Sequence, residues 1–327
     1  MDNKKVLDIR NLTVEFLSDK TTVHAVNGVN LSINKGETLG LVGETGAGKT
    51  TTALAIMGII QMPPGKITGG EIEFSDRGDL LKKKKREMRE IRGGEISMIF
   101  QDPMTSLNPA MTVGDQIAEM VMQHSSLTSR QAAEKAREML ETVGIPGSRA
   151  TEYPHQFSGG MKQRVMIAIA LACSPQLLIA DEPTTALDVT IQAQVLELMN
   201  NLKKSIDTAI LLITHDLGVV AETCEKVAIM YAGEILESGA VDDVFENPAH
   251  PYTVGLFQAI PDISQKRDRL YTIPGSMADP ADLPSGCRFH PRCPHAQERC
   301  SRDIPEMVLV GPEHWAKCHY CRKEEKV

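Results

Sequence analysis

The sequence is poor in aromatic residues and has no long apolar run. It contains one Trp, five Tyr and seven Phe among 327 residues, so we expect a core built mainly from Ile, Leu, Val, Ala and Met. A membrane-spanning helix needs about 18 to 20 apolar residues. The longest candidate, residues 165–180, is interrupted by Ser174, Pro175 and Gln176. The first ten residues, MDNKKVLDIR, lack the apolar segment of a secretory signal, so we expect the chain to begin in the cytosol.

Positive charge is also not in excess. The chain has 35 Lys and Arg against 43 Asp and Glu, a formal net charge of −8. This balance argues against a broad electrostatic grip on nucleic acid, and we expect no nucleic-acid partner. The fractions of hydrophobic residues (42%) and charged residues (24%) are ordinary for a folded protein, which excludes global disorder. The basic run from Lys82 to Arg86 is expected to be a solvated surface.

Three stretches differ in their patterns. Residues 1 to about 245 alternate short strand-like runs with helical patterns, which predicts a mostly parallel sheet covered by helices. Within them, residues 103 to about 160 are rich in Met, Ala, Gln and Glu at helical spacing, which predicts an inserted helical subdomain. Residues 246–327 are dense in proline and loop signals, and we expect a small appended domain there.

A phosphate-binding loop is predicted at residues 43–50. The segment GETGAGKT follows the apolar run TLGLV, precedes the helix-like TTALAIMG, and matches G-x-x-x-x-G-K-[ST]. In such a loop, backbone N–H groups and the start of the following helix face the phosphate oxygens. Lys49 would reach the β- and γ-phosphates, and the Thr50 hydroxyl would coordinate Mg²⁺. The residues expected to bind the nucleotide are Gly43, Glu44, Thr45, Gly46, Ala47, Gly48, Lys49, Thr50 and Thr51.

Polar residues that end further strand-like runs are candidates for the chemistry. The run PQLLIADE ends in Asp181, which can hold Mg²⁺ through water, and Glu182, which can orient or deprotonate the attacking water. His215 ends AILLITH and can contact the γ-phosphate, and Gln101 ends ISMIFQ and can bind Mg²⁺ and the lytic water. Each has a plainer interpretation. Adjacent acids often cap a helix, a histidine after a strand is often structural, and Gln101 can be an ordinary loop residue.

The combination of motifs resembles the ATP-binding cassette (ABC) ATPases. GETGAGKT, Gln101, FSGGMKQR, LLIADE, TALD and His215 occur in the family's order and spacing, and the resemblance covers residues 1 to about 245. It implies an α/β fold with a mostly parallel sheet core, an antiparallel β subdomain and an inserted α-helical subdomain, followed here by a small cysteine-rich C-terminal domain. It also implies ATP hydrolysis with Mg²⁺ bound by Thr50, Gln101 and Asp181, and catalysis by Glu182, His215 and Gln101.

The resemblance further implies a head-to-tail dimer of two ATPases. Ser158, Gly159 and Gly160 stand where the family has its signature sequence, with Phe157 and Met161 in place of the commoner leucine and glutamine. In the family the signature and the aspartate equivalent to Asp188 address the ATP held by the opposite subunit. An aromatic residue upstream of the loop usually stacks on adenine. Phe16 is the candidate, and a core phenylalanine is the alternative.

The C-terminal region resembles that of dipeptide and oligopeptide importer ATPases. NPAHPYT and CRFHPRCPHAQERC carry this resemblance, and YPHQFSGGMKQRVMIAIALA and DEPTTALDVTIQAQVLELM are typical of the D-type subunit. This implies a peripheral ATPase on the cytoplasmic face of a bacterial or archaeal cell membrane. Its implied partners are a second, homologous ATPase in a heterodimer, two transmembrane permeases and, indirectly, an extracellular peptide-binding protein. The alternatives are a soluble ABC ATPase acting on DNA or ribosomes, and an importer of another solute such as nickel or a sugar.

Five of the seven cysteines fall in the last 41 residues, which suggests a metal site in a reducing compartment. Metal binding there can replace a hydrophobic core, because its free energy becomes folding free energy. The resemblance favours a structural 4Fe-4S cluster on Cys287, Cys293, Cys300 and Cys318, with Cys321 free. Zinc remains an alternative because of the Cys318-x₂-Cys321 pair, and so do disulfides or free thiols. In the zinc case a ligand could come from His290, His295, His314 or His319.

Overall fold

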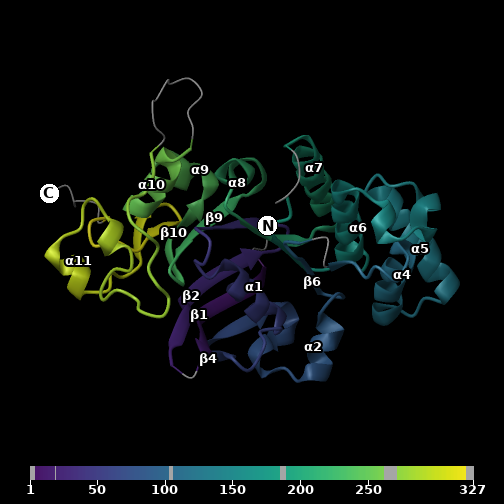
Figure 1. The fold of residues 1–327 in the computed structure, drawn as a ribbon, viewed down its shortest axis with the longest axis horizontal. Coiled ribbons are helices and arrows are strands. Elements are labelled where there is room, and N and C mark those ends of the chain that lie inside the picture. Colours follow the sequence, from purple (N-terminus) through teal and green to yellow (C-terminus); the bar gives the residue numbers. More distant parts are fainter. Residues whose placement is uncertain (1–3, 19, 103–105, 185–188, 261–270, 322–327) are drawn as a thin grey trace. The chain divides into compact units, whose positions relative to one another are not determined.

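The computed structural model describes residues 4–18, 20–102, 106–184, 189–260 and 271–321, apart from the side chains of residues 189 and 201–206. The chain divides into two compact units, which are described separately. Unit 1 comprises residues 1–7, 33–38 and 74–213, and unit 2 comprises residues 8–32, 39–73 and 214–327. Figure 1 shows the elements of both units.

Three strands of unit 1 form the parallel arrangement that their apolar runs predict. Strand β7 pairs in parallel with β6 on one side and with β8 on the other. All residues of β7 and β8 are buried, as expected for parallel strands that are covered on both faces. The strands of this unit are β5 (Gly78–Asp79), β6 (Ile96–Ile99), β7 (Leu177–Asp181) and β8 (Ala209–Thr214).

The helices of unit 1 include those predicted between residues 103 and 160. Helices α4 and α5 pack against each other, and α6 contacts both (Figure 1). Thr112 and Thr128 cap α4 and α5 by accepting hydrogen bonds from backbone N–H groups, which explains where these helices begin. The helices are η1 (Ser75–Arg77), η2 (Leu80–Lys82), α2 (Lys85–Ile91), α4 (Val113–His124), α5 (Ser129–Thr142), η3 (Gly147–Thr151), η4 (Pro154–Gln156), α6 (Gly159–Leu171) and α7 (Val189–Ile206).

Unit 2 contains a mixed sheet that the C-terminal residues extend. Strand β9 pairs in parallel with β3 and antiparallel with β10, and β12 continues antiparallel from β10 to β11. The C-terminal strands β11 and β12 therefore extend the sheet of unit 2. In a second sheet, β1 lies between β2 and β4. The strands are β1 (Lys5–Leu17), β2 (Thr22–Asn34), β3 (Thr38–Val42), β4 (Gly65–Phe74), β9 (Lys226–Tyr231), β10 (Glu234–Ala240), β11 (Val308–Gly311) and β12 (His314–Ala316).

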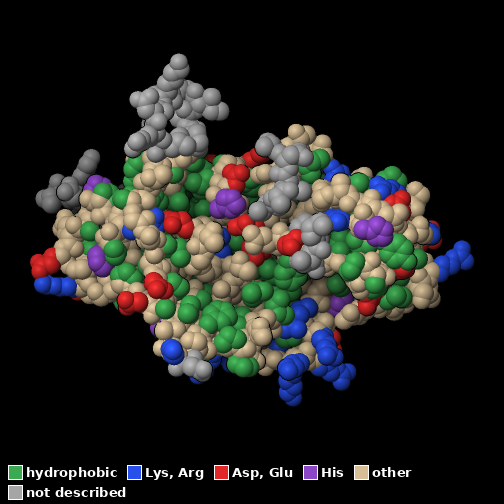
Figure 2. Space-filling view, in the orientation of Figure 1, with side chains coloured by type: hydrophobic (Ala, Val, Ile, Leu, Met, Phe, Trp, Pro, Cys, Tyr) green, Lys and Arg blue, Asp and Glu red, His purple; other side chains and the backbone are tan. Residues whose placement is uncertain are grey.

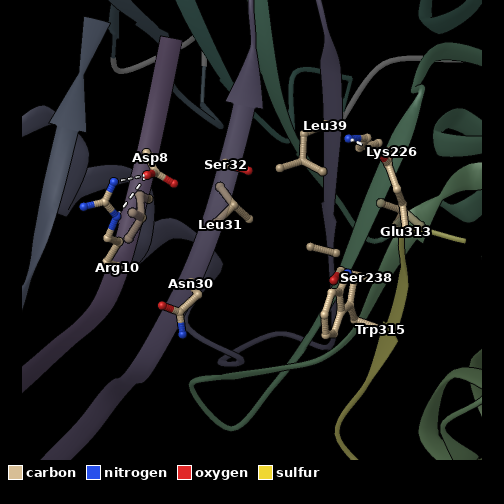
Figure 3. A pocket seen from close by; sticks show the side chains of 14 residues that line it. Asp8, Arg10, Asn30, Leu31, Ser32, Leu39, Lys226, Ser238, Glu313 and Trp315 are labelled. Atoms are coloured by element: carbon tan, nitrogen blue, oxygen red, sulfur yellow. Dashed lines mark hydrogen bonds and ion pairs between the residues drawn. The ribbon is translucent and has the colours of Figure 1, made fainter. Parts of the chain in front are cut away.

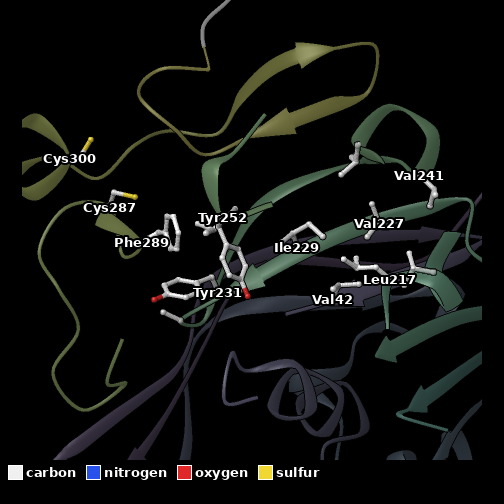
Figure 4. Packing of buried hydrophobic residues seen from close by; sticks show 14 residues of the cluster. Val42, Leu217, Val227, Ile229, Tyr231, Val241, Tyr252, Cys287, Phe289 and Cys300 are labelled. Carbon is white, nitrogen blue, oxygen red and sulfur yellow. The ribbon is translucent and has the colours of Figure 1, made fainter. Parts of the chain in front are cut away.

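Unit 2 contains a buried cluster that includes three of the few aromatic rings. Tyr231, Tyr252 and Phe289 pack with ring centroids 4.8 to 5.4 Å apart, and Figure 4 shows Phe289 between Cys287 and the two tyrosines. Tyr252 and Phe289 come from the C-terminal region, so that region supplies part of the core. The helices are α1 (Lys49–Met57), α8 (Leu217–Thr223), α9 (Val241–Glu246), α10 (Pro251–Gln258), η5 (His290–Arg292) and α11 (Glu298–Arg302).

The surface around the basic run agrees with the expectation of a solvated face. Lysine and arginine side chains project from the region of α2 (Figure 2), where Lys82 pairs with Asp79 at 3.1 Å and Arg86 approaches Glu90 at 3.9 Å. The basic run is thus a solvated, partly paired surface. In the described part of the chain, no helix combines the length and the apolar character that crossing a bilayer requires.

Candidate active site

The predicted phosphate loop connects β3 to α1 in unit 2. Gly48 precedes α1 with φ +104°, and a Cβ atom there would lie 2.3 Å from the backbone oxygen of Ala25. Only glycine fits this position. The N-cap of α1 is Gly48, which has no side chain that could cap the helix. This backbone arrangement suits an anion.

Lys49 is held against the loop by backbone oxygens. Its Nζ donates hydrogen bonds to Gly43 O at 2.7 Å and to Glu44 O at 3.1 Å, and the residue is only 6% exposed. Thr50 is exposed and Thr51 half-buried at the start of α1. The ammonium group therefore lies at the loop, which fits the predicted contact with phosphate oxygens.

Two of the predicted catalytic residues of unit 1 contact each other. Gln101 Nε2 donates a hydrogen bond to Glu182 Oε2 at 2.9 Å, although 81 residues separate the two in sequence. Asp181 is the last residue of β7 and is 2% exposed. Glu182 follows with φ +47°, a left-handed conformation that is uncommon for non-glycine residues and is often found at functional sites. Carboxylate and amide oxygens at the ends of the neighbouring parallel strands β7 and β6 are suitable ligands for Mg²⁺.

The remaining predicted catalytic and nucleotide-binding residues have different surroundings. His215 is exposed between β8 and α8 in unit 2. Phe16 is half-buried in β1, where a Cβ on Gly65 would lie 3.2 Å from its ring, so it is not a fully buried core residue. Asp188 lies outside the described residues.

The signature residues begin helix α6 in unit 1. Ser158 is the exposed N-cap, and its Oγ accepts a hydrogen bond from the N–H of Met161 at 3.4 Å. A Cβ on Gly159 would meet no atom within 4 Å, so this side of the helix start is open. A Cβ on Gly160 would lie 2.6 Å from Ile191 Cγ2 of α7, which explains that glycine by close helix packing. An open helix N-terminus of this kind suits a phosphate group.

Arg149 contacts both residues in which the signature departs from the family's commoner sequence. Its guanidinium carbon lies 4.4 Å from the centroid of the Phe157 ring, and its Nη1 lies 3.4 Å from Met161 Sδ. Glu152 binds the same guanidinium group with several hydrogen bonds, at 2.6 Å for the shortest. The two substitutions are therefore accommodated together.

The four predicted cluster cysteines line one cavity of about 120 Å³ in unit 2. Burial raises the pKa of Cys287 to about 11, which is typical of a structural thiol rather than a reactive one. No disulfide forms among the seven cysteines, all of which are described residues. Within the described ranges, no three His, Cys, Asp or Glu side chains already form a ligand set. The thiol donors and the shared cavity nevertheless fit a thiolate-bound metal.

The histidines considered for zinc separate into two groups. His290, His295 and His319 line the same cavity as the four cysteines. The His314 imidazole is hydrogen-bonded to Glu237 at 2.7 Å, with both groups buried, and it does not line the cavity. Cys321 is also absent from the lining, and its thiol donates to Ala249 O at 3.0 Å.

Sequence reasoning missed two residues next to the phosphate loop. Tyr252 and Arg292 both contact Glu44, which is the second residue of that loop. The signal was available, since they lie in the segments NPAHPYT and CRFHPRC. From the sequence, these segments indicated only that the C-terminal region resembles that of peptide importer ATPases.

A second cavity, of about 440 Å³, also lies among residues that the sequence did not single out (Figure 3). Charged groups on its lining are paired, with Arg10 to Asp8 at 2.6 Å and Lys226 to Glu313 at 3.3 Å. Trp315, the only tryptophan of the chain, forms part of the wall. Because the charges are already compensated, nothing in the lining selects a charged ligand.

Two family models match the chain. The model described as ABC transporter matches residues 26–185, and the model described as oligopeptide/dipeptide transporter, C-terminal region, matches residues 236–300. The oligopeptide transport ATP-binding protein AppD of Bacillus subtilis is 50% identical, with 98% of each chain covered. The oligopeptide transport ATP-binding protein OppD of Salmonella typhimurium is 50% identical over 96% of this chain and 93% of that protein.

Solved structures give the same result for the cassette. A dimeric ATP-binding cassette in a post-hydrolysis state with ADP and Pi matches with TM-score 0.64 and 26% identity, covering 72% of this chain and 98% of that one. The cbiO1 protein of Clostridium perfringens, part of an ABC transporter complex, matches with TM-score 0.64 and 27% identity over 77% and 95% of the two chains. The fold is that of an ATP-binding cassette ATPase. Within that class, the chain belongs to the family of oligopeptide and dipeptide transport ATP-binding proteins.

Proposed function

We propose that this chain is the ATP-hydrolysing subunit that energises import of dipeptides or oligopeptides, bound peripherally to the cytoplasmic face of a bacterial membrane. The observation that carries the proposal is the 50% identity to AppD over 98% of both chains, which includes the C-terminal region as well as the cassette. We assign residues 1–245 to the nucleotide-binding domain, with its helical subdomain at about 103–160. Residues 246–327 form the C-terminal region.

In the proposed mechanism, Glu182 acts as the general base toward the attacking water. The hydrogen bond from Gln101 fixes Glu182 Oε2, so the carboxylate has a defined orientation. Thr50, Gln101 and Asp181 would hold Mg²⁺, which when bound offsets the negative charge on the phosphate oxygens. His215 would contact the γ-phosphate, and Phe16 would stack on adenine. The loop residues 43–51 would bind the phosphates.

Hydrolysis is coupled to transport through a second ATPase in this proposal. Ser158, Gly159, Gly160 and Asp188 would contact the ATP of a homologous but distinct partner, which makes a heterodimer. ATP closes the pair, the helical stretch that follows Gln101 moves with it, and two transmembrane permeases follow that motion. An extracellular peptide-binding protein would deliver the substrate to the permeases.

Fractionation and reconstitution test this proposal. We expect the chain in the membrane pellet with two multi-span partners, and we expect peptide-loaded binding protein to stimulate ATP hydrolysis in reconstituted vesicles. Binding protein loaded with nickel or a sugar serves as the control for the other importer classes. Salt-sensitive association with DNA or ribosomes, without the permeases, would instead support the soluble ABC ATPase.

We propose further that Cys287, Cys293, Cys300 and Cys318 hold a structural 4Fe-4S cluster, with zinc as the alternative. The shared cavity and the four thiol donors support this assignment. A bound cluster would supply cross-linking between loops that have little regular structure of their own. Arg292 and Phe289, which lie in the same loop as Cys287 and Cys293, would be held in place with it.

Metal analysis of anaerobically purified protein should find about four iron and four sulfide per chain. Cys293→Ser should lose most of both, whereas Cys173→Ser, at a half-buried cysteine of unit 1, should retain them. Zinc without iron would overturn the cluster in favour of its alternative. Protein with neither metal, and unchanged by Cys293→Ser, would overturn both.

A further inference from the structure

Glu44 of the phosphate loop is held by two residues of the C-terminal region. Its backbone N–H donates a hydrogen bond to Tyr252 Oη at 3.1 Å. Its carboxylate accepts two hydrogen bonds from Arg292 Nη1, at 3.0 and 3.1 Å. The C-terminal region also reaches Gly46, where a Cβ would lie 3.0 Å from Met277 Cε. All these contacts lie within unit 2.

Arg292 is built into its position. The residue is 8% exposed, its Nε donates to Pro274 O at 2.9 Å, and its guanidinium carbon lies 5.8 Å from the Tyr231 ring centroid. Among the described residues, Glu44 is the carboxylate within ion-pair distance of it. A buried guanidinium group needs such a partner, and its planar fork limits where the partner can lie.

Tyr252 is fixed by a chain of buried hydrogen bonds. Glu237 of β10 accepts from the N–H groups of Ala249 and His250 at 2.7 and 2.8 Å. His250 Nδ1 accepts from the N–H of Tyr252 at 3.0 Å, and burial lowers the pKa of His250 to about 3, so the imidazole is a neutral acceptor at pH 7. The turn before α10 is therefore rigid, and it sets the position of the Tyr252 hydroxyl group at the loop.

We propose that Arg292 and Tyr252 are positioning residues of the nucleotide site, which neutralise and orient Glu44 so that the loop accepts a polyanionic triphosphate. This inference rests on the proposed function, since it requires residues 43–50 to bind ATP. Without Arg292, the Glu44 carboxylate would stand unbalanced beside several phosphate charges and repel them. Arg292 directly precedes Cys293 in the sequence. The loop that positions Cys293 therefore also positions Arg292.

Nucleotide affinities of charge variants of the full-length chain test this inference. R292M should weaken binding of a non-hydrolysable ATP analogue about tenfold, because it uncovers the Glu44 charge. The weakening should shrink from the ATP analogue to ADP to AMP and vanish for adenosine. The double variant E44Q/R292M should return to within about threefold of wild type, because the repelling charge is gone. A residue with only a structural role would give neither the charge series nor the rescue.

Controls separate this inference from the proposed function. R299M changes an exposed arginine of α11 that pairs with Asp303, and it should leave all affinities unchanged. A wild-type chain that binds no ATP analogue would refute the proposed function itself. A wild-type chain that binds, together with R292M of equal affinity, would refute only the role of Arg292. Equal weakening for AMP and the ATP analogue, without rescue in the double variant, would also refute it.

Two further variants test the inference in case R292M does not fold. Y252F removes the hydroxyl group that accepts the hydrogen bond from the Glu44 N–H, and it should weaken binding of the ATP analogue about threefold. The effect is smaller than that of R292M because only a neutral hydrogen bond is lost. E44Q alone leaves the charge of Arg292 uncompensated near the phosphates. The variant should therefore bind the ATP analogue about threefold more tightly and bind adenosine with unchanged affinity. Unchanged or weaker binding of the analogue by E44Q would overturn the proposed charge effect.

Discussion

Replacing Glu182 by glutamine should lower the steady-state ATPase rate of the assembled transporter by about 10² to 10⁴-fold, the usual contribution of a general base. Glutamine has nearly the same shape but cannot accept the proton of the attacking water. Its amide oxygen can still accept the hydrogen bond that Gln101 donates to Glu182, so the local geometry should survive. The lower ATPase rate therefore reflects a slower chemical step rather than weaker ATP binding.

Nucleotide binding and dimer formation distinguish this effect from misfolding. Glu182→Gln should bind ATP with near-normal affinity and accumulate the closed dimer, which size-exclusion chromatography in the presence of ATP and Mg²⁺ would detect. Glu197→Gln, an exposed acid on α7 of the same unit, is the matched control and should hydrolyse ATP normally. Near-normal turnover in Glu182→Gln would remove Glu182 from its role as the base.

The elements around the catalytic residues could be predicted because their signals are local. The runs TLGLV, LLIAD and AILLIT are continuous apolar segments, and they form the buried strands β3, β7 and β8. Glycines at the phosphate loop and at the start of α6 mark positions where backbone atoms or another helix come too close for a side chain. Each of these steric requirements concerns a single residue position, so a sequence motif can reveal it.

Contacts between distant segments could not be predicted in this way. Tyr252 and Arg292 lie 208 and 248 residues from Glu44, and no spacing rule connects them. The hydrogen bond between His314 and Glu237 likewise depends on β12 pairing with β10. Strand pairing is also a long-range property, so proline and loop signals in residues 246–327 did not predict that β11 and β12 join the sheet of unit 2.

Replacing Lys49 by alanine should weaken ATP binding by about 10²-fold or more, since truncating one partner of a desolvated charge pair typically costs about 2 to 5 kcal/mol. Lys49 is buried, and its ammonium group is held at the loop by Gly43 O and Glu44 O. The alanine variant loses the cation that balances the phosphate charge, and two loop carbonyls lose their donor. Both changes act on nucleotide binding. The main effect should therefore be a higher ATP concentration for half-maximal activity, rather than a lower maximal turnover rate.

Equilibrium titration with a fluorescent ATP analogue measures this loss, and the unfolding midpoint without nucleotide shows whether the chain is intact. Alanine is the best helix former, so the first turn of α1 should survive the substitution. Lys66→Ala, at an exposed lysine of β4, is the control and should bind ATP as the wild-type chain does. Adenosine, which has no phosphates, should bind Lys49→Ala and the wild-type chain alike. If Lys49→Ala bound ATP as tightly as the wild-type chain, residues 43–50 would not be the phosphate site.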